Sequence, residues 1–151
     1  MSIENRLTEL GITLPDAPAP AANYVPFVQT GNLVFISGQI SQNEAGLITG
    51  KLGDSMSVEQ GAEAARRCGQ ALIAQLKAAI GDLDRVKRVV KLTGFVNSTP
   101  DFTDQPKVVN GCSDLMVQVF GDAGRHARAA VSAPSLPLGV SVEIEAVFEI
   151  A

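Results

Sequence analysis

The sequence is poor in the side chains from which most catalytic metal centres are built. Its 151 residues include no Trp, one Tyr (Tyr24) and one His (His126). A single His excludes a two-histidine zinc site and most centres with several histidine ligands, so we expect no metal centre of that kind. Cys68 and Cys112 lie far apart and form no CxxC unit, and we expect both to be buried free thiols.

Charge and hydropathy exclude further classes of protein. Twelve basic and sixteen acidic residues give a net charge of −4, which disfavours the clustered basic surface that nucleic acids require. No apolar run reaches the roughly 18 residues of a membrane span, and the N-terminus lacks the pattern of a secretory signal. We therefore expect a cytoplasmic protein with neither membrane nor nucleic acid as a partner.

The first 23 residues differ in composition from the rest. Ser2 can cap a short helix that runs to Leu10. The segment 14–22 then carries three prolines, which exclude regular helix and central strand. The sequence therefore predicts an N-terminal helix and a Pro/Ala-rich arm over residues 1–23, followed by a single domain over 24–151.

Periodicity within that domain predicts strands and two helices. A Ser57–Gln60 capping box precedes an amphipathic stripe, and Pro106 is a favoured first-turn residue for a second helix. The predicted elements are strands over 24–30 and 33–40, a helix over 58–80, a strand over 86–96, a helix over 106–120 and strands over 127–133 and 140–150. This order predicts an α+β fold in which a mixed sheet carries both helices on one face. The other face must then be solvated or covered by another subunit.

Polar side chains concentrate near the C-terminus. On a strand over 127–133, His126, Arg128 and Ala130 would share one face. An Arg in an apolar strand needs a partner, which can be Glu143 or Glu145 in an ion pair, or the carboxylate of a ligand. His126 can be a surface histidine or a catalytic one.

The final strand presents carboxylates on one face. Glu143 and Glu145 alternate there with apolar residues and share their face with Ser141. They can line a solvated face, or one of them can position a water molecule. The sequence contains no Walker A, GxGxxG or GxSxG motif that would indicate another chemistry.

Three motifs together resemble the Rid/YjgF family, the reactive-intermediate imine and enamine deaminases, some of which carry the older name L-PSP endoribonuclease. The motifs are Ile36-Ser37-Gly38-Gln39-Ile40, Ala127-Arg128-Ala129-Ala130-Val131 and the stretch from Leu136 to Ala146. The resemblance extends from about Tyr24 to the C-terminus. It implies a chorismate-mutase-like fold and a homotrimer whose sites lie in clefts between subunits.

The resemblance also assigns roles to individual residues. Arg128 matches the arginine that binds the substrate carboxylate, and Glu143 matches the glutamate that helps water to attack the imine carbon. The resemblance implies that substrate-binding positions of the cleft correspond to Ser37, Gly38, Phe27, Asn110 and Ala130. We add His126, two residues from Arg128, to the expected substrate-binding residues, as a replacement for part of the polar equipment that this sequence lacks. Phe27 stands where typical deaminases have a tyrosine, and Ala130 where they often have a cysteine.

The function implied by the resemblance is hydrolysis of 2-imino or 2-enamino acids to 2-oxo acids and ammonia, without a cofactor. Two alternatives stay open. One is a regulatory trimer that binds 2-oxo acids without turnover, which the two departures at Phe27 and Ala130 motivate. The other is an L-PSP-type endoribonuclease, which the acidic composition disfavours.

Overall fold

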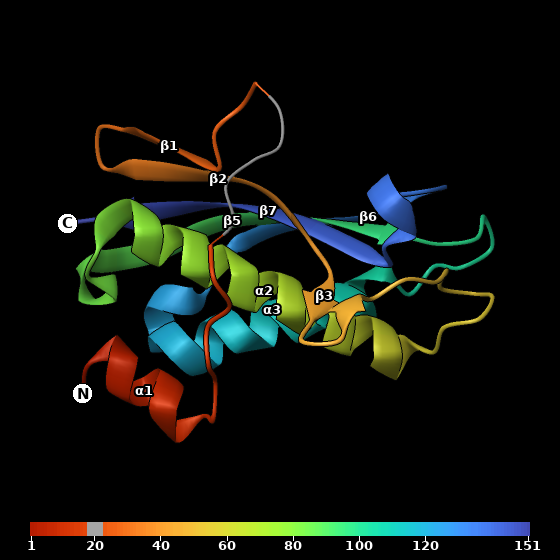
Figure 1. Cartoon of the computed structure of the whole chain (residues 1–151), viewed down its shortest axis with the longest axis horizontal. Helices are drawn as coiled ribbons and strands as arrows, with labels where there is room; N and C mark the ends of the chain where they lie inside the picture. Colours follow the sequence, from red (N-terminus) through yellow and green to blue (C-terminus); the bar gives the residue numbers. More distant parts are fainter. Residues whose placement is uncertain (18–22) are drawn as a thin grey trace.

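A five-stranded sheet and two long helices form the body of the protein (Figure 1). The computed structural model describes residues 1–17 and 23–151. The strands run in the order β1-β2-β7-β5-β6, and a separate short hairpin pairs β3 with β4. The strands are β1 (Phe27–Thr30), β2 (Leu33–Ile40), β3 (Gln42–Asn43), β4 (Gly46–Leu47), β5 (Val86–Asn97), β6 (Ala127–Ala133) and β7 (Val142–Ile150). The helices are α1 (Ile3–Glu9), α2 (Val58–Ile80), α3 (Gln105–Phe120) and the short 3-10 turns η1 (Leu83–Arg85), η2 (Gly121–Gly124) and η3 (Pro137–Gly139).

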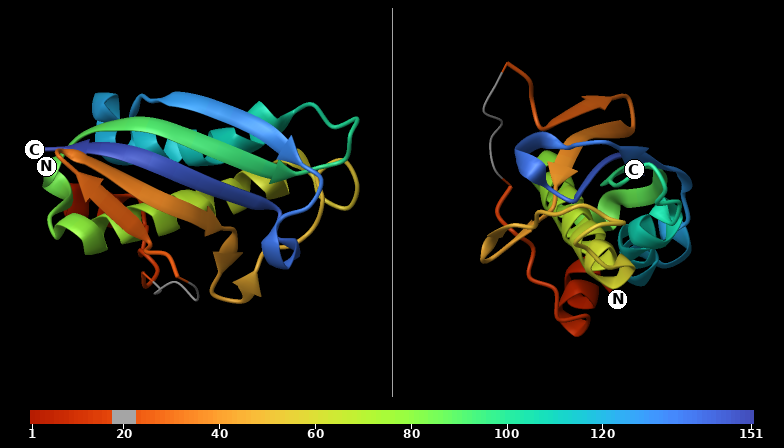
Figure 2. Two further views of the ribbon diagram at one scale, coloured as in Figure 1. Left: turned by 90° about the horizontal axis from the view of Figure 1, so that it is seen from above. Right: turned by 90° about the vertical axis from the view of Figure 1, so that its right-hand side faces the viewer.

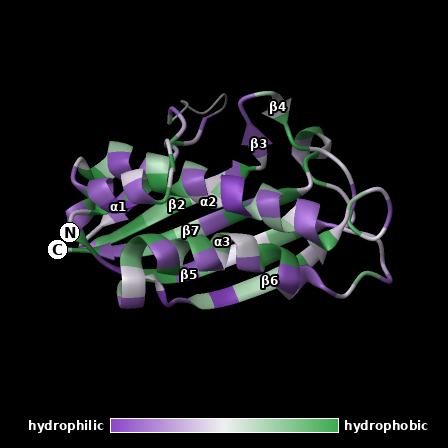
Figure 3. Ribbon diagram, turned by 90° about the horizontal axis from the view of Figure 1, so that it is seen from below, coloured by the Kyte–Doolittle hydropathy of each residue, from purple (hydrophilic) through white to green (hydrophobic). Residues whose placement is uncertain are grey.

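The two long helices lie side by side on one face of the sheet (Figure 2). Hydrophilic and hydrophobic residues alternate along both helices (Figure 3), and the apolar stripes contain the buried residues that join the core, as predicted. The capping box expected at α2 forms, because the Ser57 hydroxyl accepts from the Gln60 N–H and the Gln60 amide accepts from the Ser57 N–H. The predicted α+β architecture, with both helices on one face, is therefore confirmed.

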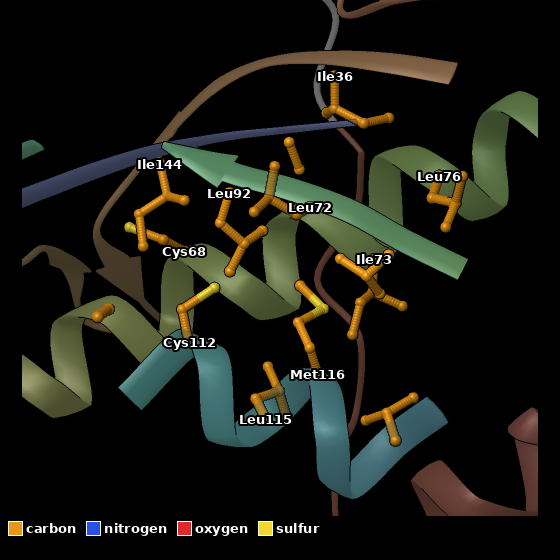
Figure 4. Packing of buried hydrophobic residues seen from close by; sticks show 14 of the residues in the cluster. Ile36, Cys68, Leu72, Ile73, Leu76, Leu92, Cys112, Leu115, Met116 and Ile144 are labelled. Atoms are coloured by element: carbon orange, nitrogen blue, oxygen red, sulfur yellow. The ribbon is translucent and has the colours of Figure 1, made fainter. Parts of the chain in front are cut away.

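The core lies between this helical layer and the sheet, and both cysteines belong to it (Figure 4). Cys68 and Cys112 are fully buried free thiols, as expected. Glycine allows α2 and α3 to approach closely: a Cβ at Gly111 would lie 1.9 Å from the carbonyl oxygen of Ala62. This contact fixes the first half of α3 against α2, and that half carries part of the site described below.

The N-terminal helix packs against the outside of this layer. The hydroxyl of Ser2 accepts from the Asn5 N–H and caps α1, as predicted. Leu7 is buried against the core cluster, and the Ile3 N–H donates to the Asp84 carboxylate. Residues 18–22 of the predicted Pro/Ala-rich arm lie outside the described residues. Within the described ranges, no helix combines the length and apolarity needed to cross a membrane.

Two predicted strands are shorter in the structure. The first begins at Phe27 rather than at residue 24, because Pro26 has no N–H to donate to a sheet. The last begins at Val142, since the preceding turn η3 and Val140 instead pair with the loop that contains Thr49. The loop 41–54 contains the small β3–β4 hairpin.

Candidate functional site

The two predicted catalytic residues leave opposite faces of the sheet. Arg128 on β6 pairs with Leu92 of β5, which is buried beneath the helices. Glu143 on β7 pairs with Phe95 of β5, three residues further along the same strand. Paired residues share a face and successive residues alternate. Arg128 therefore points to the helical layer, and Glu143 points to the face without helices.

The two side chains are also far apart along the sheet. β5 separates β6 from β7, so their backbones are about 10 Å apart across two strand spacings. Three residues of offset add about 10 Å along the strand direction. The ion pair between Arg128 and Glu143 or Glu145, one of the alternatives that the sequence left open, does not form. The ion pairs found among residues 1–17 and 23–151 do not include Arg128.

Arg128 is held by neutral groups of α3. Its Nη1 donates to the Oδ1 of Asn110 at 2.7 Å and to the Oγ of Ser113 at 3.2 Å. Ser113 in turn lies 2.8 Å from the Nε2 of His126, whose Nδ1 lies 2.6 Å from the carbonyl oxygen of Gly124. We call these groups the arginine half of the site. The predicted residues Asn110, His126 and Arg128 thus come together, with Ser113 as an addition.

One edge of the guanidinium is unoccupied by these contacts. The two bonds to α3 use Nη1. Across the described ranges, no hydrogen bond is found from Nε or Nη2 of Arg128. These two nitrogens form a planar fork that matches the two oxygens of a carboxylate. Because the partners on α3 are neutral, they leave the positive charge of Arg128 uncompensated, and an anion is its natural ligand.

Glu143 lies on the other face against the backbone of β2. A Cβ at Gly38 would lie 2.2 Å from its Oε2, so the carboxylate rests directly on this glycine. Burial raises the pKa of Glu143, and the neighbouring carboxylate of Glu145 raises it further. Glu143 is half-buried and Glu145 exposed, whereas Ser141, expected on the same face, is fully buried. A carboxylate with a raised pKa in this setting can accept a proton from water.

Ser37 belongs to the same region as Glu143 through its neighbour Gly38. Its hydroxyl donates to the carbonyl of Val25 at 2.9 Å, and its N–H donates to the carbonyl of Pro26. The register of β2 against β7 is interrupted between Ile36 and Gln39, and this irregularity brings the Ser37–Gly38 backbone over Glu143. We call Ser37, Gly38 and Glu143 the glutamate half.

Phe27 belongs to neither half. It pairs with the buried Ile36 and packs against the core on the helical side of β1, at the sheet edge opposite β6. The aromatic side chain that this segment exposes is Tyr24, adjacent to the Val25 carbonyl that binds Ser37. Phe27 was expected to line the site, and in this chain it faces the helical side of β1 instead. The pairing register of β1 with β2 determines which face of the sheet Phe27 occupies, and the turn at Gly31 sets that register.

Ala130 lies beside the arginine half. It pairs with Gly94 on the helical face, two residues from Arg128, and packs against the core. The sequence prediction omitted Ser113, although a usable signal was present. Asn110 and Ser113 are three residues apart on a helix, and such residues share one face.

Neither half is enclosed in the single chain. Cavities of about 500, 400 and 310 Å³ lie elsewhere, and none of these three includes Arg128 or Glu143 in its lining. Within the described part of the chain, no group of three His, Cys, Asp or Glu side chains is arranged to hold a metal ion. Neither Arg128 nor Glu143 therefore lines any of these three cavities.

Comparison with known proteins identifies the family of this chain. Residues 4–149 match the family model described as "YjgF/chorismate mutase-like, putative endoribonuclease", and the chain belongs to this family. Protein TCP17 of Trypanosoma cruzi is 53% identical over 95% of this chain and 91% of its own length. A 2-iminobutanoate/2-iminopropanoate deaminase of Dermatophagoides farinae is 31% identical over 90% of this chain and 92% of its own length.

Solved structures show the same fold. A protein of unknown function from Agrobacterium tumefaciens superimposes with a TM-score of 0.92 at 49% identity, covering 99% of this chain and 92% of the other. RidA of a Psychrobacter species gives a TM-score of 0.58 at 29% identity, covering 89% of this chain and 94% of the other. The chorismate-mutase-like fold predicted from the sequence is thereby confirmed.

Proposed function

We propose that the protein hydrolyses 2-imino acids to 2-oxo acids and ammonia in a cleft that two subunits of a homotrimer build together. The observation that carries the proposal is the unoccupied Nε–Nη2 edge of Arg128, a fork for a carboxylate that neutral groups hold in place. The names of the deaminases among the relatives support the choice of substrate.

A second copy is needed because the two halves diverge. A small 2-imino acid such as 2-iminobutanoate cannot span from Arg128 to Glu143 across the sheet of one chain, as their strand positions show. The arginine half of one subunit and the glutamate half of its neighbour can face one ligand. The uncovered sheet face also exposes apolar side chains suited to an interface, with Val28 52%, Phe35 43% and Val131 45% exposed.

The reaction then needs little machinery. Arg128 binds the carboxylate through two parallel hydrogen bonds and so fixes the adjacent imine carbon. Glu143 accepts a proton from a water molecule as the water oxygen bonds to the carbon of the protonated imine, whose C=N electron pair moves to nitrogen, and a neutral tetrahedral amino alcohol forms. Glu143 returns this proton to the amine nitrogen. The C–N bond then breaks and ammonia leaves, while the hydroxyl proton passes to the Glu143 carboxylate as the C=O bond forms. The raised pKa of Glu143 makes it a stronger base for the first step.

The test is to generate 2-iminobutanoate with an amino-acid oxidase and to follow its conversion to 2-oxobutanoate. We expect the protein to accelerate this step and Arg128→Ala to abolish most of the acceleration. The matched control is Arg66→Ala, because Arg66 also donates to a neutral side chain of α3, the Oε1 of Gln118. An acceleration that survives Arg128→Ala would overturn the proposal. Calorimetric binding of 2-oxobutanoate without turnover would favour the regulatory alternative.

A further inference from the structure

A continuous chain of hydrogen bonds links Arg128 to the turn after α3. It runs from Arg128 Nη1 to the Oγ of Ser113 (3.2 Å), on to Nε2 of His126 (2.8 Å), and from Nδ1 of His126 to the carbonyl of Gly124 (2.6 Å). Both ring nitrogens of the single histidine are thus occupied within the protein. His126 was expected to contact substrate, but these bonds leave no ring nitrogen for it.

The Gly124 carbonyl at one end of this chain can only accept and the Arg128 guanidinium at the other end can only donate. These two groups determine which atom donates in every hydrogen bond between them. The carbonyl of Gly124 can only accept, so Nδ1 of His126 carries the hydrogen. In a neutral imidazole Nε2 then accepts, and Ser113 donates its hydroxyl hydrogen to it. The oxygen of Ser113 keeps its lone pairs for the Nη1–H of Arg128, which can only donate. Each polar atom has one consistent role.

The far end of the chain is rigid. Gly124 ends the turn η2 and packs directly on α3, since a Cβ there would lie 2.2 Å from the carbonyl oxygen of Met116. A larger residue could not keep this backbone position, and so the accepting carbonyl is fixed relative to the helix that carries Ser113. The histidine ring is held between two points of one rigid unit.

We propose that Ser113 and His126 are positioning residues that lock the orientation of the Arg128 guanidinium. With Asn110 on the same nitrogen, the relay commits both hydrogens of Nη1 and leaves the Nε–Nη2 fork turned to the ligand. An arginine side chain that must order itself on binding loses rotamer freedom, and a preorganised one avoids much of that loss. The identity of the ligand as a 2-oxo or 2-imino acid rests on the proposed function, whereas the relay itself does not.

The first experiment measures binding to the full-length protein by calorimetry, with 2-oxobutanoate and its neutral amide as probes. Ser113→Ala and His126→Phe are each expected to weaken binding of the acid about tenfold and to leave binding of the amide unchanged. The double variant should bind no more weakly than Ser113→Ala, because removing the serine already breaks the relay. Ser113→Thr and His126→Gln retain the hydroxyl and the acceptor, and they should bind the acid within about threefold of the wild type.

The second experiment reads the guanidinium directly, without a ligand. In selectively labelled protein, the Nη signals of Arg128 should be separately resolved in ¹⁵N spectra and should merge in Ser113→Ala and His126→Phe, as rotation is freed. Unchanged Arg128 signals, additive losses in the double variant, or equal losses for acid and amide would each overturn the relay. If the signals respond but the wild type neither binds nor converts the acid, the relay holds and the proposed function fails.

Discussion

The arginine half and the glutamate half of the site are built in different ways. Arg128 lies on an edge strand and is held by side chains of α3, all within one chain. Glu143 lies on the central strand β7, rests on the Gly38 backbone and faces away from the helices, with the like charge of Glu145 close by. In the arginine half, hydrogen bonds within one chain already hold the Arg128 side chain. In the glutamate half, the Glu143 carboxylate has a raised pKa and lies on the sheet face that no helix covers. This difference supports the proposal that a second subunit completes the site.

The largest expected effect is the recovery of turnover when two inactive variants assemble together. Arg128→Ala and Glu143→Gln subunits, differently tagged and co-expressed in equal amounts, should recover about a quarter of wild-type turnover. Over all randomly assembled trimers, about one cleft in four receives Arg128 from one variant and Glu143 from the other. A trimer that contains both variants has roughly one such cleft in three. Turnover of the unfractionated mixture is the measurement, and the doubly tagged fraction alone should recover about a third. A site contained in one chain would recover nothing at any mixing ratio.

Gly38→Ala should damage the glutamate half selectively. The new Cβ would meet the Glu143 carboxylate at 2.2 Å, so that side chain must move. We expect a loss of about 1–2 kcal/mol in the free energy of unfolding and at least a tenfold loss of turnover. Urea denaturation measures the first effect. In a Glu143→Ala background the stability loss should vanish; if it persists, the glycine is required for a reason other than this contact.

The pH dependence of stability should report on the glutamate half alone, through the titration of Glu143. Burial and Glu145 raise the folded-state pKa of Glu143 above its ordinary value of 4.5, so its charged form is disfavoured in the folded protein. The contribution of Glu143 to stability is therefore full below pH 4.5 and is lost as the pH rises through the raised pKa. Glu143→Gln should gain roughly 1–3 °C in melting temperature relative to the wild type between pH 4 and pH 7.

The matched control is Glu145→Gln, which removes an exposed carboxylate. Without Glu145, the pKa of Glu143 should move back towards its ordinary value. The loss of stability with rising pH that the wild type shows should therefore become smaller without disappearing. A melting-temperature difference between Glu143→Gln and the wild type that stays constant from pH 4 to pH 7 would contradict the raised pKa.

The smallest effect is expected at the two thiols beneath the halves. Burial raises the pKa of Cys112 to about 12, although Arg128 lowers it somewhat, and burial raises the pKa of Cys68 still more strongly, with Cys112 and Glu143 adding to the effect. Neither thiol should react with a thiol-specific disulfide reagent at pH 7 in the folded protein, and both should react in denaturant. Rapid labelling of either residue before unfolding would show that the core opens at one half of the site.

The sequence determined much of this protein by local rules. Apolar periodicity and caps placed α2 and α3 within a residue or two of their observed ends, and the alternation in residues 140–150 identified β7. The motifs around Ser37, Arg128 and Glu143 identified the family and the two catalytic candidates. These features are short-range, because a helix, a strand or a motif is specified by residues close to one another in the chain.

Only the tertiary structure decided how these residues face one another. The register of β5 against both β6 and β7 sends Arg128 and Glu143 to opposite faces, and a shift of one residue in either pairing would have reversed the result. The register of β1 likewise turned the partly buried Phe27 towards the helical side of the sheet. The link from Arg128 through Ser113 to His126 depends on packing between α3 and β6. Pairings between distant segments leave no local signal in a single sequence, and in this protein they determine the site.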